Sequence, residues 1–517
     1  MGVPVHPARA AGHLRPPTTD EVARYAKDHH LSLSQVEIDA LAAGIGASLA
    51  VYDHIDGLEP SPVVLRHQHR DPGRPPTRDE DPFNAFVRLC DVRGADTGPL
   101  QGRSVAVKDC IAVAGIPTTN GGRREPYAVP TEDAVVIERI LDAGATIVGK
   151  TNMDDMAYGL GEGSYFGAAR NPLNPRYSTG GSSSGSGAAV AAGLADMALG
   201  ADEGGSVRVP AAWCGLVGMK ATHGLVPSYG LSYMDHTIDH IGPITRDVAD
   251  NALLLEVIAG GDWRDPQWVR GLPSNIPSYA TAGERGIEGL RIGVIAESLE
   301  PSDCSPGVLE AFHAGEGALA AIGAELSVVS VPLWTDALAI LRVILSFGLH
   351  AMMTSGGQGY GHLGRVDVGA MAATVAQNRL GANDLPLAVQ SSLLTVEYLK
   401  DAYLGLHFGR AQNLRLDLRR QIDRTLSDVD LLITPTTATV AFELLNRRAE
   451  PGELVTRLGT HTGVVNTAPL DLSGHPALTV PCGLAENGLP AGLQIIGPRF
   501  GEELVYRAGF AFEAFGS

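Results

Sequence analysis

Two loops rich in glycine and serine constrain this chain more than any other feature of its sequence. The first is Gly180-Gly181-Ser182-Ser183-Ser184-Gly185-Ser186-Gly187, and the second is Asp202-Glu203-Gly204-Gly205-Ser206-Val207-Arg208. Glycine permits a tight, positive-φ backbone in which successive N–H groups point to one place. A serine in such a turn places a hydroxyl nucleophile beside those N–H groups. The loops therefore predict acyl transfer, with a nucleophile and an oxyanion hole.

Two other interpretations of the loops agree less well with the surrounding residues. A flexible linker rarely runs directly into an apolar, helix-forming stretch such as residues 188–201 and then into a Gly-Gly-Ser-Val-Arg-Val-Pro turn. A phosphate-binding loop needs a lysine beside its glycines, and no lysine lies between Lys150 and Lys220. Acyl transfer remains the favoured chemistry.

The base that activates the serine is expected to be a lysine. Arginine carries most of the positive charge, because the lysines are only Lys27, Lys108, Lys150, Lys220 and Lys400. Lys108 ends the apolar, strand-like run 104–107, and burial at a strand end favours the neutral form of an amine. Lys108 is therefore a candidate proton acceptor, although a surface or ion-paired lysine is the alternative for this residue taken alone.

Several motifs, in this order along the chain, resemble the amidase signature family of serine hydrolases. The resemblance covers most of the chain from about Asp81 onward. It rests on the two loops and on residues 105–109, 149–154, 170–172, 215–222, 242–246, 432–436, 474–481 and 488–494. It implies an α/β protein with the amidase signature fold, a large mixed sheet sandwiched by helices, here with an N-terminal helical extension.

The resemblance also implies a Ser-cisSer-Lys triad. Ser206 is then the nucleophile, Ser182 the bridging serine after a cis peptide bond, and Lys108 the base that starts neutral. The backbone N–H groups of Glu203, Gly204, Gly205 and Ser206 are expected to hold the oxyanion. Ser183 and Ser184 are expected to bond to backbone within their loop rather than to take part in the chemistry.

No cofactor and no metal are expected. His236 and His240 bracket Asp239 at a spacing that could suit a metal pair, but the sequence offers no third ligand. Packing or pocket lining is the favoured role for these histidines.

Glu203 departs from the family pattern, in which a neutral residue usually lies three positions before the nucleophile. A carboxylate there opposes the charge of an oxyanion unless it is protonated, turned away or paired. Arg208 and Arg176 are candidate partners by sequence proximity. A Glu203 that faces the substrate would disfavour substrates that carry a carboxylate.

Charge and composition favour a cytoplasmic enzyme. The formal net charge of −19 argues against nucleic acid and anionic membranes as partners, because both bind a basic face. The five cysteines form no Cys-x-x-Cys pair, and residues 1–17 lack the apolar core of a secretory signal. No apolar run reaches the length of a membrane span.

The chain is expected to divide into an N-terminal helical extension with its connector, residues 1–80, and a catalytic domain, residues 81–517. Capping and spacing signals predict two helices in the extension, the second with Ile38, Leu41, Ile45 and Leu49 on one stripe. Helix 135–141 and strand 146–148 follow, and residues 331–420 are mostly helical in pattern. Residues 60–82 and 260–277 have the composition of loops.

The favoured function is hydrolysis of small acyl amides to a carboxylic acid and ammonia or an amine, through an acyl-Ser206 intermediate. The helical extension and residues 239–243 resemble the acylamide amidases of nitrile pathways. A small-molecule amide is thus the expected partner, with self-association into a homodimer through residues 15–58. The alternatives are the same chemistry on a carbamate, hydrazide or anilide, and, in another class, the glutaminase subunit of a tRNA-dependent amidotransferase.

Overall fold

The computed structural model describes residues 14–58, 61, 63–123, 128–267, 271–300, 303–445 and 463–516. The chain forms two compact units, Met1–Val64 and Leu65–Ser517. Residues 65–80, which the sequence places with the N-terminal extension, therefore belong to the larger unit.

The small unit contains the two expected helices, α1 (Thr19–Asp28) and α2 (Gln35–Asp56). Each begins with a capping box, in which the N-cap hydroxyl accepts a hydrogen bond from the backbone of a glutamate that reaches back to the N-cap amide. Thr18 caps α1 and Ser34 caps α2. These boxes explain why both helices begin where they do.

The described part of the large unit is built on one sheet of twelve strands in the order β1-β2-β4-β3-β5-β7-β6-β11-β12-β10-β8-β9. The strands are β1 (Arg70–Arg74), β2 (Phe86–Arg93), β3 (Ser104–Lys108), β4 (Thr146–Thr151), β5 (Met197–Asp202), β6 (Val217–Lys220), β7 (His240–Thr245), β8 (Arg291–Ile295), β9 (Glu325–Val329), β10 (Leu431–Pro435), β11 (Ala477–Leu484) and β12 (Pro490–Ile496). β3 runs parallel to β4 and β5, and β8 runs parallel to β9 and β10, whereas the other neighbours are antiparallel. The expected mixed sheet of an α/β fold is confirmed.

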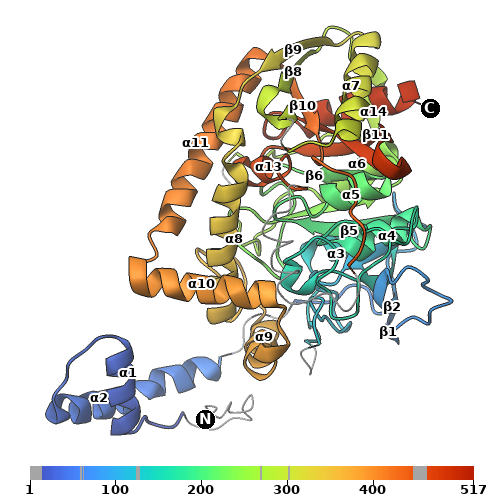
Figure 1. The fold of residues 1–517 in the computed structure, drawn as a ribbon. Helices are drawn as coiled ribbons and strands as arrows, with labels where there is room; N and C mark the ends of the chain where they lie inside the picture. The colour runs from blue at the N-terminus through green and yellow to red at the C-terminus, as the bar shows by residue number, and fades with distance from the viewer. Residues whose placement is uncertain are drawn as a thin grey trace. The chain divides into compact units, whose positions relative to one another are not determined.

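Helices cover this sheet (Figure 1). They are α3 (Val135–Asp142), α4 (Ser184–Ala191), α5 (Arg208–Cys214), α6 (Val248–Ile258), α7 (Pro306–Ala321), α8 (Ala337–Thr354), α9 (Val368–Leu380), α10 (Leu387–Tyr403), α11 (His407–Asp428), α13 (Ala468–Ser473) and α14 (Glu502–Gly516). The long helices α8 and α11 lie side by side, and α10 also packs on α8. The helical pattern expected for residues 331–420 is confirmed.

The alternation of side chains along β3 sets the two faces of the sheet. Val105 and Val107 belong to the same buried cluster as Ile137 of α3 and Leu254 of α6. Ala106 points to the opposite face, where it packs with Ala189 of α4. Because residues two apart on a strand share a face, the Lys108 side chain lies on the α4 side.

The apolar run at residues 188–201 is not one helix. Helix α4 ends at Ala191, and strand β5 begins at Met197. Gly193 lies between them with φ +69°, a left-handed conformation that a helix cannot continue through. The turn sends the chain back as β5, which places the second glycine loop beside the first.

Strand β1 lies within a segment whose composition predicts a connector loop. Its sequence, Arg-Asp-Pro-Gly-Arg, has no strand propensity, yet it pairs antiparallel with β2 at the edge of the sheet. An edge strand tolerates proline, because one side of its backbone needs no partner. Here tertiary pairing overrides local preference.

Among the described residues, α8 is the helix whose length and composition would suffice to cross a membrane. Its Ile340, Leu341 and Ile344 lie in one buried cluster with Leu418 of α11 and Leu470 of α13. α8 therefore packs as a core helix of this unit.

Candidate active site

Lys108, at the end of β3, is in direct contact with Ser182 of the first glycine loop. The Lys108 Nζ donates to Ser182 Oγ at 2.8 Å and to the Ala201 carbonyl at 3.1 Å, and both side chains are fully buried. The peptide bond between Gly181 and Ser182 is cis. Lys108 lies at the end of β3, and Ser182 lies in the loop before α4. The fold therefore brings together two residues that are far apart in sequence.

The first loop packs closely on its surroundings. A Cβ on Gly181 would lie 2.3 Å from Asp154 Oδ2, so only glycine fits there. Asp154 accepts hydrogen bonds from the amides of Gly161 at 2.7 Å and Gly163 at 2.5 Å. Burial raises the pKa of Asp154 to about 6, although these amides oppose the shift. Asp154 thus holds the backbone beneath the Ser182 loop.

The serines next to Ser182 bond to backbone outside the loop rather than within it. Ser183 Oγ donates to the Ala201 carbonyl at 3.1 Å, and Ser184 Oγ donates to the Asn152 carbonyl at 3.4 Å. The Ser183 hydroxyl therefore fastens the first loop to β5, the strand that leads into the second loop.

The second loop turns around Asp202. This buried carboxylate accepts hydrogen bonds from the amides of Gly205 at 2.6 Å and Val207 at 3.0 Å. Gly205 has φ +134°, and a Cβ there would lie 2.3 Å from Thr467 Oγ1. The turn therefore requires glycine at this position for both its backbone conformation and its space.

Ser206 follows this turn and lines a cavity of about 340 Å³ together with Glu203, Gly204, Leu341 and Arg342. Ser206 is 8% exposed, whereas Lys108 and Ser182 are completely buried. Of these three residues, Ser206 is thus the one that a substrate can reach.

The amides expected to form an oxyanion hole differ in their partners. Gly205 N–H is engaged by Asp202, and the Glu203 N–H interacts with its own carboxyl, which lowers the pKa of that group. The amides of Gly204 and Ser206 have no hydrogen-bond partner within the described ranges. These two N–H groups are free to bind an oxyanion.

Glu203 is buried, with 3% exposure, and neither candidate arginine pairs with it. Its Oε2 has no hydrogen-bond partner in the part of the chain that the structure describes. Burial raises the pKa of Glu203 to about 7, Lys108 lowers it, and Asp202 raises it further. Burial therefore favours the uncharged form of this carboxyl.

Each of the two arginines has a partner that is distant in sequence. Arg208 forms ion pairs with Asp202 at 3.0 Å and with Asp471 at 2.7 Å, all fully buried. Arg176 pairs with Glu443 at 2.6 Å near the surface. Burial, followed by the charge of Asp202, raises the pKa of Asp471 well above its usual range.

The other buried lysines, Lys150 and Lys220, bond to residues outside the two glycine loops. Lys150 Nζ lies 3.2 Å from Asp109 Oδ1 and donates to Thr118 Oγ1. Lys220 donates to the His475 carbonyl at 2.7 Å, and burial lowers the pKa of Lys220 to about 7. Neither lysine has a hydrogen bond to a serine among the described residues.

The histidines around Asp239 make separate contacts. His236 Nε2 lies 2.7 Å from the Gln358 carbonyl, whereas His240 Nδ1 lies 3.2 Å from the Asp202 carbonyl. Within the described ranges, no group of three or more His, Cys, Asp or Glu side chains could hold a metal ion.

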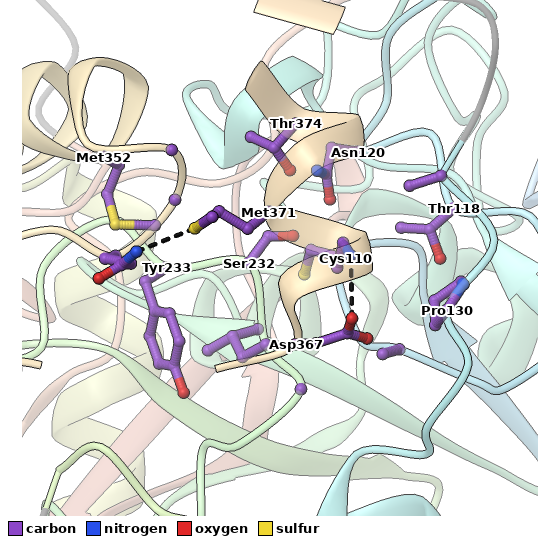
Figure 2. A pocket seen from close by; sticks show the side chains of 18 of the residues that line it. Cys110, Thr118, Asn120, Pro130, Ser232, Tyr233, Met352, Asp367, Met371 and Thr374 are labelled. Carbon is purple, nitrogen blue, oxygen red and sulfur yellow. Dashed lines mark hydrogen bonds between the residues drawn. The ribbon is translucent and has the colours of Figure 1, made fainter. Parts of the chain in front are cut away.

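A second cavity has a volume of about 140 Å³ (Figure 2). Met156 and Tyr233 line it, while their sequence neighbours Ala157 and Met234 line the Ser206 cavity. Thioether and thiol side chains project into it from Cys110, Met352 and Met371, the last on α9 (Figure 2). None of the expected triad residues is on its wall.

Several side chains of the site have no role that the sequence assigns. Asp154 lies in one of the family-like motifs, but nothing local shows that it supports the Ser182 loop. Arg342 and Thr467 come from segments far from both loops, and only the fold brings them to the Ser206 cavity or turn. No local signal identifies them.

A model of the family described as Amidase matches residues 88–506. A glutamyl-tRNA(Gln) amidotransferase subunit from Haloarcula marismortui is 39% identical over 432 residues, which cover 83% of this chain and 99% of the relative. A protein of the same name from Synechococcus sp. (strain WH7803) is 37% identical over 494 residues, covering 95% of this chain and 93% of the relative.

A solved structure agrees with these relatives. The same glutamyl-tRNA(Gln) amidotransferase subunit from Thermotoga maritima superimposes with a TM-score of 0.65 at 33% identity. The match covers 83% of this chain and 85% of that chain.

These findings correct two expectations from the sequence. A stand-alone amidase for small acyl amides is wrong as the favoured function, because the curated relatives are amidotransferase subunits. A homodimer with a small amide as its partner and no relation to nucleic acid is wrong for the same reason. The helical extension does not argue against such a role, because an alignment over 95% of the chain includes most of residues 1–64.

The family match spans both glycine loops and the strand that ends at Lys108, and it agrees with the twelve-stranded mixed sheet. The chain therefore belongs to the amidase signature family, and it is an enzyme that hydrolyses amide C–N bonds.

Proposed function

We propose that this protein is the amide-hydrolysing subunit of a tRNA-dependent amidotransferase. It releases ammonia from the side-chain amide of glutamine. The assembly transfers that ammonia to the side-chain carboxyl of glutamyl-tRNA(Gln), after ATP has phosphorylated one carboxylate oxygen so that it leaves as phosphate. The names of the relatives at 37–39% identity support this function. The contact between Lys108 Nζ and Ser182 Oγ at 2.8 Å is the structural observation that carries the chemistry, together with the accessibility of Ser206.

In this proposal Ser206 is the nucleophile. Its hydroxyl proton passes to Ser182 as the Ser182 proton passes to the neutral Nζ of Lys108, while the Ser206 oxygen attacks the amide carbon. The ammonium of Lys108 then returns the proton through Ser182 to the departing nitrogen, which leaves as ammonia. Water cleaves the acyl-Ser206 ester by the same proton route and releases glutamate.

The free amides of Gly204 and Ser206 stabilise the tetrahedral oxyanion. They lie on the turn that Asp202 and Arg208 hold in place, so little reorganisation is needed during the reaction. Removal of one oxyanion donor typically costs about 10²–10³ in kcat in serine hydrolases. The Gly205 amide serves the geometry of the turn through its bond to Asp202.

The cavity supports glutamine as the substrate. Arg342 of α8 lines the wall of the Ser206 cavity, and no described residue pairs with its guanidinium. A guanidinium is suited to the α-carboxylate of an amino acid, because it offers a planar pair of donors. An uncharged Glu203 does not repel such a substrate.

The tRNA is assigned to other subunits of the assembly. The formal net charge of −19 leaves this chain without the basic surplus that binds a nucleic acid backbone. Glutamyl-tRNA(Gln) therefore binds mainly to the other subunits. Ammonia passes from the hydrolysis of glutamine in this chain to the amidation of glutamyl-tRNA(Gln) in the assembly. Because aminoacyl-tRNA is used in the cytoplasm, we place the protein there.

The test uses the assembly that co-purifies with the tagged, full-length chain from its native cells. With glutamine as the nitrogen source and ATP present, this assembly is expected to convert glutamyl-tRNA(Gln) to glutaminyl-tRNA(Gln), measured on radiolabelled tRNA. The Ser206→Ala assembly should lose at least about 10⁴-fold of this activity. It should keep the conversion when ammonium chloride replaces glutamine, because transfer does not need the nucleophile.

The matched control is Ser184→Ala, which removes a hydroxyl from the same pair of loops without touching the proposed chemistry. It should behave like the wild type. An assembly that forms but converts no glutamyl-tRNA(Gln) with either nitrogen source would contradict the amidotransferase function. Retention of glutamine-dependent activity by Ser206→Ala would contradict the nucleophile.

A further inference from the structure

A second buried carboxyl, that of Asp239, lies near Glu203. Strands β5 and β7 pair with Ala201 opposite Ile241 and Asp202 opposite His240. Glu203 is the residue after the last pair on β5, and Asp239 is the residue before the first residue of β7. Two like charges that are close together and buried are destabilising.

Charged groups from three strands surround Glu203. Lys108 faces it from β3, Asp202 precedes it on β5, and Asp239 faces it from the residue before β7. Asp239 is fully buried and accepts hydrogen bonds from the amides of Met234 at 2.6 Å and Asp235 at 3.1 Å. Glu203 Oε2, in contrast, has no donor among the described residues.

These surroundings disfavour a negative charge on Glu203. Burial raises the pKa of Glu203 to about 7, and burial together with the charge of Glu203 raises the pKa of Asp239 well above its usual range. Both shifts have the sign expected for two carboxyls that leave water together. Arg342 lines the same cavity but is exposed, so its charge is screened by solvent.

We propose that Glu203 is a positioning residue that has to be uncharged while Lys108 accepts a proton, so that Glu203 sets the upper pH limit of the reaction. This inference rests on the roles proposed above for Ser206 and Lys108. It does not depend on which amide the enzyme hydrolyses.

The reason is a competition for one proton. If Glu203 holds that proton, Lys108 is a free amine and can accept the proton relayed from Ser206. If Lys108 holds it, an ammonium lies near a carboxylate and the base is lost. When both groups have lost their protons, Lys108 is free again, but the charge on Glu203 opposes the oxyanion at Gly204 and Ser206.

The pH dependence follows with a definite sign. Activity rises with pH as the protein loses the first of the two protons. It falls again once Glu203 ionises, by about tenfold per pH unit for the loss of one proton. The expected profile of kcat/KM is therefore a bell with its falling side above neutral pH.

Glu203→Gln tests the proposal, since it keeps the shape of the side chain and removes the charge. The full-length protein is assayed for ammonia release from L-glutamine, and from a small primary amide in parallel, between pH 5 and pH 10. The variant should lose the falling side of the bell. Its rising side should lie at the same or higher pH than in the wild type, because only Lys108 then loses a proton, and the rate should stay on an alkaline plateau. Glu203→Thr, a smaller neutral variant, should show the same loss.

Glu502→Gln is the matched control. Glu502 is also buried, with 1% exposure, its Oε1 accepts from the Thr222 amide at 2.7 Å, and its Oε2 has no partner among the described residues. This carboxyl lies outside the Ser206 cavity. The pH profile of the control should match that of the wild type.

A folded Glu203→Gln or Glu203→Thr protein that keeps the wild-type falling side would overturn the inference. So would the same change of profile in Glu502→Gln. The parallel variant Ser206→Ala separates this result from the proposed function. If Ser206→Ala is inactive and the Glu203 variants keep the wild-type profile, only the role of Glu203 fails; an active Ser206→Ala protein removes the basis of both.

Discussion

Lys108 is the residue on which the proposed chemistry depends most directly. Lys108→Arg keeps a positive charge and a hydrogen-bond donor near Ser182, but an arginine does not release its proton in a protein. We expect kcat/KM for amide hydrolysis to fall by about 10³-fold or more, as far as in Lys108→Ala. Steady-state ammonia release, with circular dichroism to establish folding, provides the measurement.

Lys400→Arg is the control for this exchange, because Lys400 is exposed and contacts Glu397 on the surface of α10. It should leave the rate unchanged. Substantial turnover by Lys108→Arg would show that a neutral lysine is not the base. The two variants thus show whether Lys108 acts through its positive charge, which arginine keeps, or through release of its proton, which arginine does not allow.

At the scale of elements, the N-caps of the small unit determine where its helices begin. Ser34 Oγ accepts from the Glu37 amide at 3.4 Å, and the Glu37 carboxylate accepts from the Ser34 amide at 2.7 Å. Ser34→Ala removes the side-chain half of this capping box. We expect it to cost about 1 kcal/mol in the stability of α2.

Hydrogen exchange of the amides in the first turns of α2 measures this effect, and exchange there should increase about fivefold. Ser48→Ala is the control within the same helix, because Ser48 Oγ only donates back to the Ile45 carbonyl at 2.7 Å. It should leave exchange at the N-terminus of α2 unchanged. Equal exchange in Ser34→Ala and the wild type would show that the box does not stabilise the helix.

At the scale of the whole molecule, the proposed chemistry lies in one unit. Lys108, Ser182 and Ser206 all belong to the unit Leu65–Ser517, and the sheet that positions them is complete within it. A chain that begins at Leu65 should therefore fold and release ammonia from an amide at a rate within about twofold of the full-length protein.

Circular dichroism and steady-state ammonia release check this prediction on the two proteins purified in parallel. A truncated protein that is folded but inactive would show that residues 1–64 contribute to the site. Loss of tRNA-dependent transfer with ammonia release intact would instead assign the small unit to assembly.

The sequence by itself determined the chemistry of the site and the class of fold. Glycines at 180–187 and 203–206 can be read locally, because a hydroxyl with exposed amides needs that backbone wherever it occurs. Lys108 was a candidate from the apolar strand that it ends, and the family resemblance favoured it over a surface or ion-paired lysine. The family-like motifs then predicted the mixed α/β sheet, and the helix boundaries followed from caps and periodicity.

The tertiary structure decided which charges meet. Sequence proximity suggested Arg208 or Arg176 as the partner of Glu203, but Arg208 binds Asp471 and Arg176 binds Glu443, both more than 250 positions away in the chain. The pairing of β5 with β7, which ends at Asp202 and His240, instead brings Asp239 near Glu203. Local sequence features also did not distinguish a stand-alone amidase from one component of a larger assembly, because the net charge and the helical extension are compatible with both. Local sequence determines turns, caps and reactive groups, whereas ion pairs and cavities depend on which distant segments the sheet order makes neighbours.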